Sequence, residues 1–94
     1  MRRDLVYSGR FVRASKRLLK RDFSLAEALK VTLRRLAEDA FQTSLRSHKL
    51  KGELMGSWSC SGGFDLRVVF EVVTGENGEE SILLQSVGTH EDVY

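Results

Sequence analysis

The second half of the chain alternates apolar and polar residues in a pattern that predicts one buried β-strand. Between Phe64 and Val73 every second position is apolar, and these positions are Leu66, Val68, Phe70 and Val72. Because successive strand residues point to opposite sides of a sheet, the other face is expected to carry Asp65, Arg67, Val69 and Glu71. That face places a carboxylate and a guanidinium two residues apart, which a strand that only fills a sheet does not need. We therefore expect a functional site there.

Helical spacing replaces this alternation in the first half of the chain. Apolar residues recur every three or four positions from Arg10 to Arg21, and again from Leu25 to near Asp39, which predicts two amphipathic helices. Ser24 and Glu27 have the spacing of a capping box, so the second helix is predicted to begin at Ser24. The two helices are expected to form a hairpin that lies on the sheet.

Shorter stretches complete the predicted sheet. Short strands are predicted from Asp4 to Ser8 and from Leu54 to Ser61, and residues 40–54 are predicted to form a loop. The turn-forming residues from Gly75 to Gly78 are expected to return the chain into a strand from Ser81 to Val87. These elements predict an α+β fold, in which an N-terminal helical hairpin packs on one face of a small, mainly antiparallel twisted sheet.

Length and composition predict one ordinary soluble domain. The chain has 94 residues, of which 41% are apolar and 30% charged, so we expect a single domain spanning residues 1–94. No segment has the apolar length of a signal peptide or a membrane span, and we expect a cytoplasmic protein. Cys60 is the single cysteine, which excludes an intrachain disulfide. It lacks the close pairing of a zinc site, so we predict a buried structural thiol and no bound metal.

The net charge of +2 hides an asymmetry along the chain. Through Lys51 there are fourteen Lys or Arg and five Asp or Glu, whereas from Gly52 onward there is one Arg and eight acidic residues. Such a distribution is expected of a domain that lays a basic side against a polyanion, usually nucleic acid. Solvated helix faces are the alternative explanation of the same pattern.

A few residues have side chains suited to acid–base or phosphate chemistry. His48 and His90 lie at the two ends of the predicted sheet region, and histidine serves as an acid or a base near neutral pH. Arg67 can hold a phosphate through two hydrogen bonds and stabilise transition-state charge. Asp65 beside two glycines fits a turn or a catalytic role, and Tyr94 stacks on a base or closes the core. The chain contains neither the Gly-x-Ser-x-Gly elbow of hydrolases nor a P-loop.

The order of these features resembles the RelE/ParE superfamily of toxins from bacterial toxin–antitoxin pairs, and most of all its YafQ-like branch. The resemblance covers nearly the whole chain and rests on the basic helical hairpin, then HKLKG from His48, WSCSGGFD from Trp58, RVVF from Arg67 and the ending GTHEDVY. It implies a RelE-like fold and a ribosome-dependent endoribonuclease, or mRNA interferase, that needs no metal or other cofactor. The ribose 2′-hydroxyl would attack its own phosphodiester. The implied partners are a cognate antitoxin, mRNA on the ribosome and ribosomal RNA, with no membrane and no small-molecule cofactor.

Four positions of the branch with catalytic or substrate-contacting roles match this chain: His48, Asp65, His90 and Tyr94. The resemblance implies that His90 protonates the leaving 5′-oxygen. Our hypothesis for the general base, which takes the 2′ proton, is either His48 or Asp65.

The phosphate is expected to be stabilised by Arg67, with help from Lys49 or Lys51 as substrate-binding residues. The chain departs from the branch at two positions, since Ser61 stands where a histidine is common and Leu66 where an aromatic residue often follows the Asp. Two alternatives therefore stay open. One is a non-nucleolytic ParE-like toxin that binds DNA gyrase, and the other is a catalytically impaired module that only binds its antitoxin.

Overall fold

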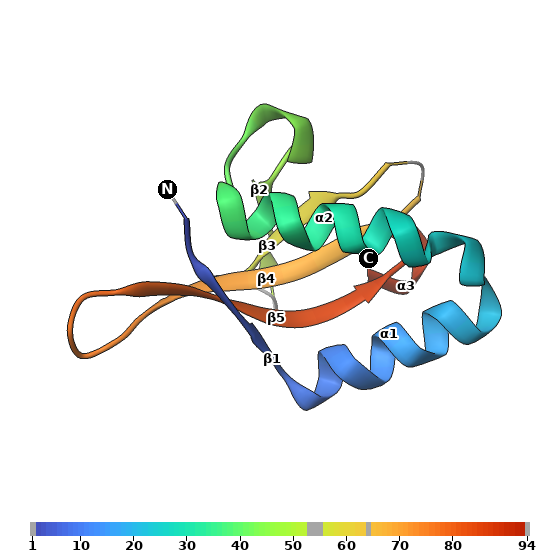
Figure 1. The fold of residues 1–94 in the computed structure, drawn as a ribbon, viewed down its shortest axis with the longest axis horizontal. Helices are drawn as coiled ribbons and strands as arrows, with labels where there is room; N and C mark the ends of the chain where they lie inside the picture. Colours follow the sequence, from blue (N-terminus) through green and yellow to red (C-terminus); the bar gives the residue numbers. More distant parts are fainter. Residues whose placement is uncertain (1, 53–55, 64, 94) are drawn as a thin grey trace.

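A twisted sheet forms the centre of the molecule, and its strands follow the order β1–β5–β4–β3–β2 (Figure 1). The structure is a computed structural model that describes residues 2–52, 56–63 and 65–93. Within these ranges the strands are β1 (Asp4–Tyr7), β2 (His48–Lys49), β3 (Trp58–Ser61), β4 (Arg67–Thr74) and β5 (Glu80–Gly88). β1 pairs with β5 in parallel, and the other neighbours pair antiparallel. Leu54 and Phe64, which the sequence assigned to strands, lie outside the described residues.

The two long helices pack on one face of this sheet. The described residues form α1 (Gly9–Arg21), α2 (Ala26–Glu38), the short α3 (His90–Val93) and 3₁₀ turns at Phe23–Leu25 and Thr43–Leu45. α1 runs beside β5, and α2 lies over the middle of the sheet (Figure 1). Both contribute to one hydrophobic core with the strands. The predicted α+β fold with a helical hairpin on a mainly antiparallel sheet is confirmed. No helix in the described ranges is long and apolar enough to cross a membrane.

α1 begins immediately after β1 and matches the predicted basic helix. The Ser8 hydroxyl accepts a hydrogen bond from the Phe11 amide (3.0 Å), which satisfies one of the donors that a helix N-terminus leaves unpaired. Phe11, Ala14 and Leu18 are buried at three- and four-residue spacing. Arg21 ends the helix, where a positive charge interacts favourably with the helix dipole.

The predicted capping box at the start of the second helix is wrong. The Asp22 carboxylate, rather than the Ser24 hydroxyl, caps this segment by accepting a hydrogen bond from the Ser24 amide (3.1 Å). A 3₁₀ turn then carries the chain to Ala26, where α2 begins, and Glu27 lies in its first turn. The Ser24 hydroxyl donates to the same Asp22 oxygen, so it is already engaged and does not cap the helix.

The predicted start of the central strand is also wrong. β4 begins at Arg67, and Asp65 lies in the turn before it. The turn is closed by hydrogen bonds from the Leu66 amide to the Gly63 carbonyl (3.0 Å) and from the Gly62 amide to the Leu66 carbonyl (2.9 Å). Gly63 has a φ of 89°, which residues with side chains rarely adopt. The direction of the Asp65 side chain is therefore set by this turn and not by strand alternation.

The face of β4 that packs on the helices agrees with the alternation in the sequence. Val68 and Phe70 are fully buried, and Val72 packs at the margin of the core. Their partners on the neighbouring strands that join the same core are Cys60, Ile82, Leu84 and Val87. The core therefore lies between β3–β4–β5 and the helical hairpin.

The opposite face carries the polar rows from which the candidate site is built. One cross-strand row runs from His48 through Ser59 and Val69 to Ser86, and the next from Ser61 through Arg67 to Gly88. Val69 was expected on an exposed face, but only 4% of it is exposed. A bulge between Val69 and Phe70 lets Gln85 accept a hydrogen bond from Ser57 (2.7 Å) and donate one to Glu71 (3.3 Å), so side chains partly cover this face.

Candidate functional site

Three of the predicted site residues meet at the end of the sheet where β4 begins and β5 ends. Arg67 pairs with Gly88, and His90 is the first residue of α3, two positions further on. The Asp65 carboxylate accepts a hydrogen bond from the His90 amide (2.9 Å). An acceptor at the start of a helix satisfies an otherwise unpaired amide, so Asp65 helps to anchor α3. The structure thus brings Asp65, Arg67 and His90 together.

Contacts with neighbouring residues orient Arg67. Its Nη1 donates to the Ser61 hydroxyl (3.2 Å) and to the Leu66 carbonyl (3.0 Å). Arg67 as a whole is half-buried. Ser61, which stands where a histidine is common in the YafQ-like branch, therefore contacts the arginine that we expect to bind phosphate. It orients a cation instead of supplying a titratable group.

His48 lies on the same face as Arg67, on the edge strand β2, with β3 between them. From the spacing of strands and of alternate residues, the two Cα atoms are about 12 Å apart. The Nδ1 atom of His48 is 3.3 Å from the Arg46 carbonyl oxygen. A carbonyl oxygen only accepts, so this contact requires a hydrogen on Nδ1. With that hydrogen in place, Nε2 is the atom at which the ring would act as a general base.

Of the predicted substrate-binding residues, Lys49 lies on the face of the sheet away from Arg67. Lys49 pairs with Trp58, and its Nζ lies 5.6 Å from the centre of the indole ring, on the side of the sheet away from His48. Lys51 is exposed in the segment that follows β2. Tyr94 lies outside the described residues.

Cys60 is the buried structural thiol that the sequence predicted. It is fully buried in β3 beneath the helices and is a free cysteine. Burial raises its pKa to about 12, while the Val68 backbone and the Arg67 charge act weakly in the opposite direction. A thiol with this pKa carries no nucleophilic thiolate at neutral pH. In the described part of the chain, no three His, Cys, Asp or Glu side chains form a group that could hold a metal ion.

The sequence analysis predicted no helix after the strand that ends at Val87, so it missed α3. The signal is present, because Thr89 and Asp92 have the spacing of a capping box. In the structure the Thr89 amide donates to Asp92 Oδ2 (3.0 Å), and the Asp92 amide donates to the Thr89 hydroxyl (3.3 Å). Asp92 also forms an ion pair with Arg21 of α1, with Nη2 and Oδ2 separated by 2.6 Å.

A basic groove lies beside α3. β1 pairs with β5 only up to Leu84, so α1 flanks the last residues of β5 directly. A cavity of about 200 Å³ opens there, and the polar side chains that line it are Arg10, Arg17, Arg21, Ser86 and Asp92. The groove therefore presents three guanidinium groups on one helix face, and guanidinium is the group that pairs best with phosphate oxygens.

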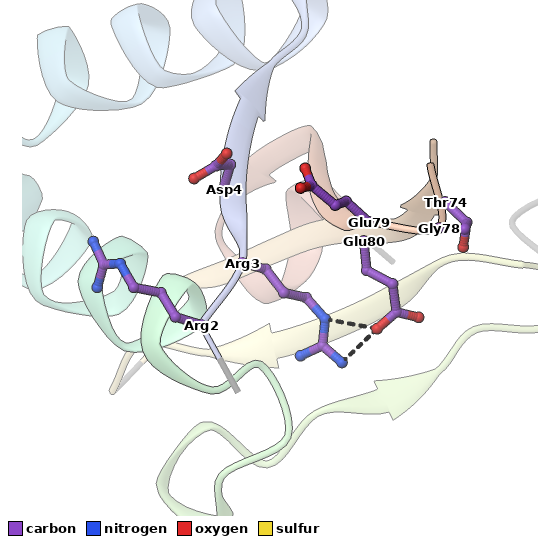
Figure 2. A pocket seen from close by; sticks show the side chains of 7 residues that line it. All are labelled: Arg2, Arg3, Asp4, Thr74, Gly78, Glu79 and Glu80. Carbon is purple, nitrogen blue, oxygen red and sulfur yellow. Dashed lines mark hydrogen bonds and ion pairs between the residues drawn. The ribbon is translucent and has the colours of Figure 1, made fainter. Parts of the chain in front are cut away.

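A second hollow, of about 470 Å³, lies at the other end of β5 (Figure 2). Arg3 spans it, and its guanidinium donates to the Glu80 carboxylate through Nε (3.2 Å) and Nη2 (3.0 Å). The same guanidinium lies 5.6 Å from the Phe41 ring, and the Arg3 amide donates to the Ala37 carbonyl. Arg3 is thus occupied in joining β1, β5 and the end of α2. The walls also carry Asp4 and Glu79, so this hollow is a structural junction of mixed charge.

Solved structures of YafQ and of a YoeB/ParE toxin share this fold. YafQ comes from E. coli. A histidine-to-glutamine variant of it superposes with a TM-score of 0.75 at 20% identity, covering 99% of each chain. A YoeB/ParE toxin from Agrobacterium tumefaciens gives a TM-score of 0.72 at 21% identity, covering 93% of this chain and 98% of that one.

The E. coli DinJ–YafQ toxin–antitoxin complex also matches, with a TM-score of 0.75 at 18% identity over 100% of this chain and 99% of that one. At these identities the likeness concerns the fold. No protein-family model matches the sequence, and no curated protein is significantly similar to it in sequence. The YafQ-like fold expected from the sequence is confirmed.

Proposed function

We propose that this protein is the toxin of a type II toxin–antitoxin system and acts as a ribosome-dependent endoribonuclease that cleaves mRNA without a metal ion. The observation that carries the proposal is the meeting of Asp65, Arg67 and His90 at one end of the sheet, through the Asp65–His90 hydrogen bond and the Arg67–Gly88 pair. An acid–base residue beside a partly exposed arginine is the minimum that metal-free cleavage of a phosphodiester needs.

The role proposed for each site residue follows from its position on the face of the sheet that points away from the core. In an in-line displacement the attacking and leaving oxygens lie on opposite sides of phosphorus, so the base and the acid must flank the phosphate. Arg67 lies between the row of His48 and the start of α3. We assign His48 Nε2 to take the 2′ proton, Arg67 to hold the phosphate and His90 to protonate the 5′-oxygen. Asp65 is second choice as the base, because one of its carboxylate oxygens is engaged with the His90 amide.

We propose that the ribosome aligns the mRNA in the site. One positioned acid or base contributes about 10²- to 10⁴-fold, and an electrostatic donor a similar amount, so a site with few groups needs its substrate held in place. The groove beside α1 supplies arginines for the phosphates of ribosomal RNA. On this proposal the protein is cytoplasmic, and a cognate antitoxin silences it as DinJ pairs with YafQ in the solved complex.

The experiment expresses the wild-type chain and the His90→Ala variant in bacteria and maps mRNA 5′ ends within translated codons. We expect wild type to arrest growth and create new ends, and His90→Ala to reduce their rate of formation about 10²- to 10⁴-fold. Glu91→Ala, a change of the exposed neighbour on α3, is the matched control and should cleave like wild type.

A ParE-like gyrase poison is the second candidate. It is favoured by Ser61, whose hydroxyl contacts Arg67 where the branch commonly supplies another histidine. Growth arrest that persists in His90→Ala, without His90-dependent ends in mRNA, would reject the nuclease. Gyrase-dependent DNA breaks under the same conditions would then establish the second candidate.

A further inference from the structure

We infer that the ion pair between Arg21 and Asp92 is a latch that positions His90 for proton transfer. This inference rests on the catalytic role proposed for His90 and names two residues that act on His90 through α3. Arg21 is the last residue of α1, and Asp92 lies on α3, 71 positions further along the chain. The pair therefore joins the helical hairpin to the short helix that carries the acid.

α3 needs such support because it is only four residues long. An isolated helix of this length does not form in water, since one turn closes too few hydrogen bonds to offset the lost backbone entropy. The reciprocal hydrogen bonds between Thr89 and Asp92 define its first turn, and the Asp65 carboxylate anchors its first amide. These contacts shape the turn and fix its start. The Arg21–Asp92 ion pair adds a contact that ties α3 to α1.

The geometry around Asp92 shows that α3 is pressed against the sheet. A Cβ atom on Gly88 would lie 2.6 Å from Asp92 Cβ and 2.9 Å from its Oδ2, so only glycine permits this approach. Gly88 is the cross-strand partner of Arg67. By holding Asp92 over Gly88, Arg21 keeps α3, and with it His90, next to the arginine that binds the scissile phosphate.

The electrostatics of Asp92 agree with this role. Its pKa is lowered, first by the hydrogen bond from the Thr89 amide and then by the hydrogen bond and charge of Arg21. The carboxylate is therefore ionised at neutral pH and serves two donors at once. Both side chains are partly exposed, at 55% and 40%, so the pair should contribute little to global stability. Its effect should appear locally, in the order of α3.

The test compares Arg21→Ala, Arg21→Lys and the control Lys16→Ala, an exposed position on α1 outside the groove. Hydrogen exchange of the Thr89 and His90 amides is measured by NMR on the purified full-length chain, and cleavage is measured on ribosomes carrying mRNA. For Arg21→Ala we expect amide exchange about tenfold faster and cleavage about tenfold slower, with an unchanged melting temperature. Arg21→Lys should recover part of both effects, and Lys16→Ala should match wild type.

Two results would overturn the latch. One is wild-type amide exchange in Arg21→Ala, whatever happens to cleavage, because slower cleavage alone would mean that Arg21 contacts RNA directly. The other is an equal acceleration of exchange in Lys16→Ala, which would reflect the charge of α1 and not the ion pair. If wild type itself cleaves no RNA, the proposed function fails, and the exchange measurement still decides whether Arg21 orders α3.

Discussion

At the scale of single residues, the structure places side chains that can take part in chemistry in different environments. Cys60 and Arg67 lie in neighbouring strands, yet one is sealed beneath the helices and the other is only half-buried. Adjacent residues of a strand face opposite sides of a sheet, so a register of one residue decides which group can meet a substrate. His48 and Lys49 are divided in the same way, which is why the histidine stays in the proposed site and the lysine packs on Trp58.

The Cys60 thiol should resist alkylation in the folded protein. Burial raises its pKa from 9.0 to about 12, so the folded protein keeps the thiol protonated at a pH where the unfolded chain has begun to lose the proton. Stability conferred by this group is present below pH 9 and is lost as pH rises toward 12. Iodoacetamide at pH 8.5 should label the urea-unfolded chain and leave the native one unlabelled when both are followed by mass spectrometry. Rapid labelling of the native chain would contradict this burial.

At the scale of elements, α2 packs closely against the turn before β4, and this contact determines the position of the turn that carries Asp65. A Cβ atom on Gly62 would collide with Thr32 Oγ1 of α2 and lie 2.6 Å from Leu66 Cδ2. Thr32 is itself buried and donates to the Ala28 carbonyl, so it has little room to move. The two glycines of this turn therefore serve packing and backbone geometry, and they set the position of Asp65.

Gly62→Ala should destabilise the protein by about 1–3 kcal/mol, the usual cost of forcing an extra methyl group into a packed contact. Urea unfolding followed by circular dichroism measures the change. Gly75→Ala is the matched control, because the added Cβ would meet its nearest neighbour, Asn77 Oδ1, at 3.4 Å. Equal unfolding midpoints for the two variants would show that α2 can move away from the turn at no cost.

At the scale of the whole molecule, the two ends of β5 differ in the charged residues that surround them. The basic groove and the proposed site lie at its C-terminal end, while the acidic residues Glu79 and Glu80 lie at its start, in the β4–β5 hairpin that projects beyond the helices (Figure 1). The near-neutral net charge therefore conceals a local concentration of arginine beside the C-terminal end of β5, opposite an end of mixed charge. Such polarity orients a protein on a polyanion such as the ribosome.

Replacing Arg10 and Arg17 together by Ala should weaken ribosome binding and make it less dependent on salt. If each arginine neutralises one phosphate, the slope of log affinity against log salt should decrease by roughly two. Binding is measured by filter retention of labelled protein on small ribosomal subunits across a salt series. Arg2→Ala, in the hollow at the opposite end of β5, is the control and should keep the wild-type slope. An unchanged slope in the double variant would exclude the groove as a phosphate site.

The sequence alone was sufficient for features that depend on neighbours within a few positions. Helical spacing predicted α1 and α2, alternation predicted the core face of Val68 and Phe70, and residue types marked His48, Arg67 and His90 as candidates. These features follow from backbone periodicity, which is the same in every protein. The Thr89–Asp92 spacing was of the same local kind and was overlooked.

Only the tertiary structure decided which of these groups meet. Asp65 reaches the His90 amide 25 positions away because a glycine turn redirects its side chain, and Arg21 reaches Asp92 because β1 ends at Tyr7 and leaves α1 beside the end of β5. Both contacts depend on strand register and helix packing, which are determined by the fit of the whole core and not by any local stretch. The sequence therefore identifies which chemical groups are available to the proposed site, whereas the tertiary structure determines how those groups are arranged.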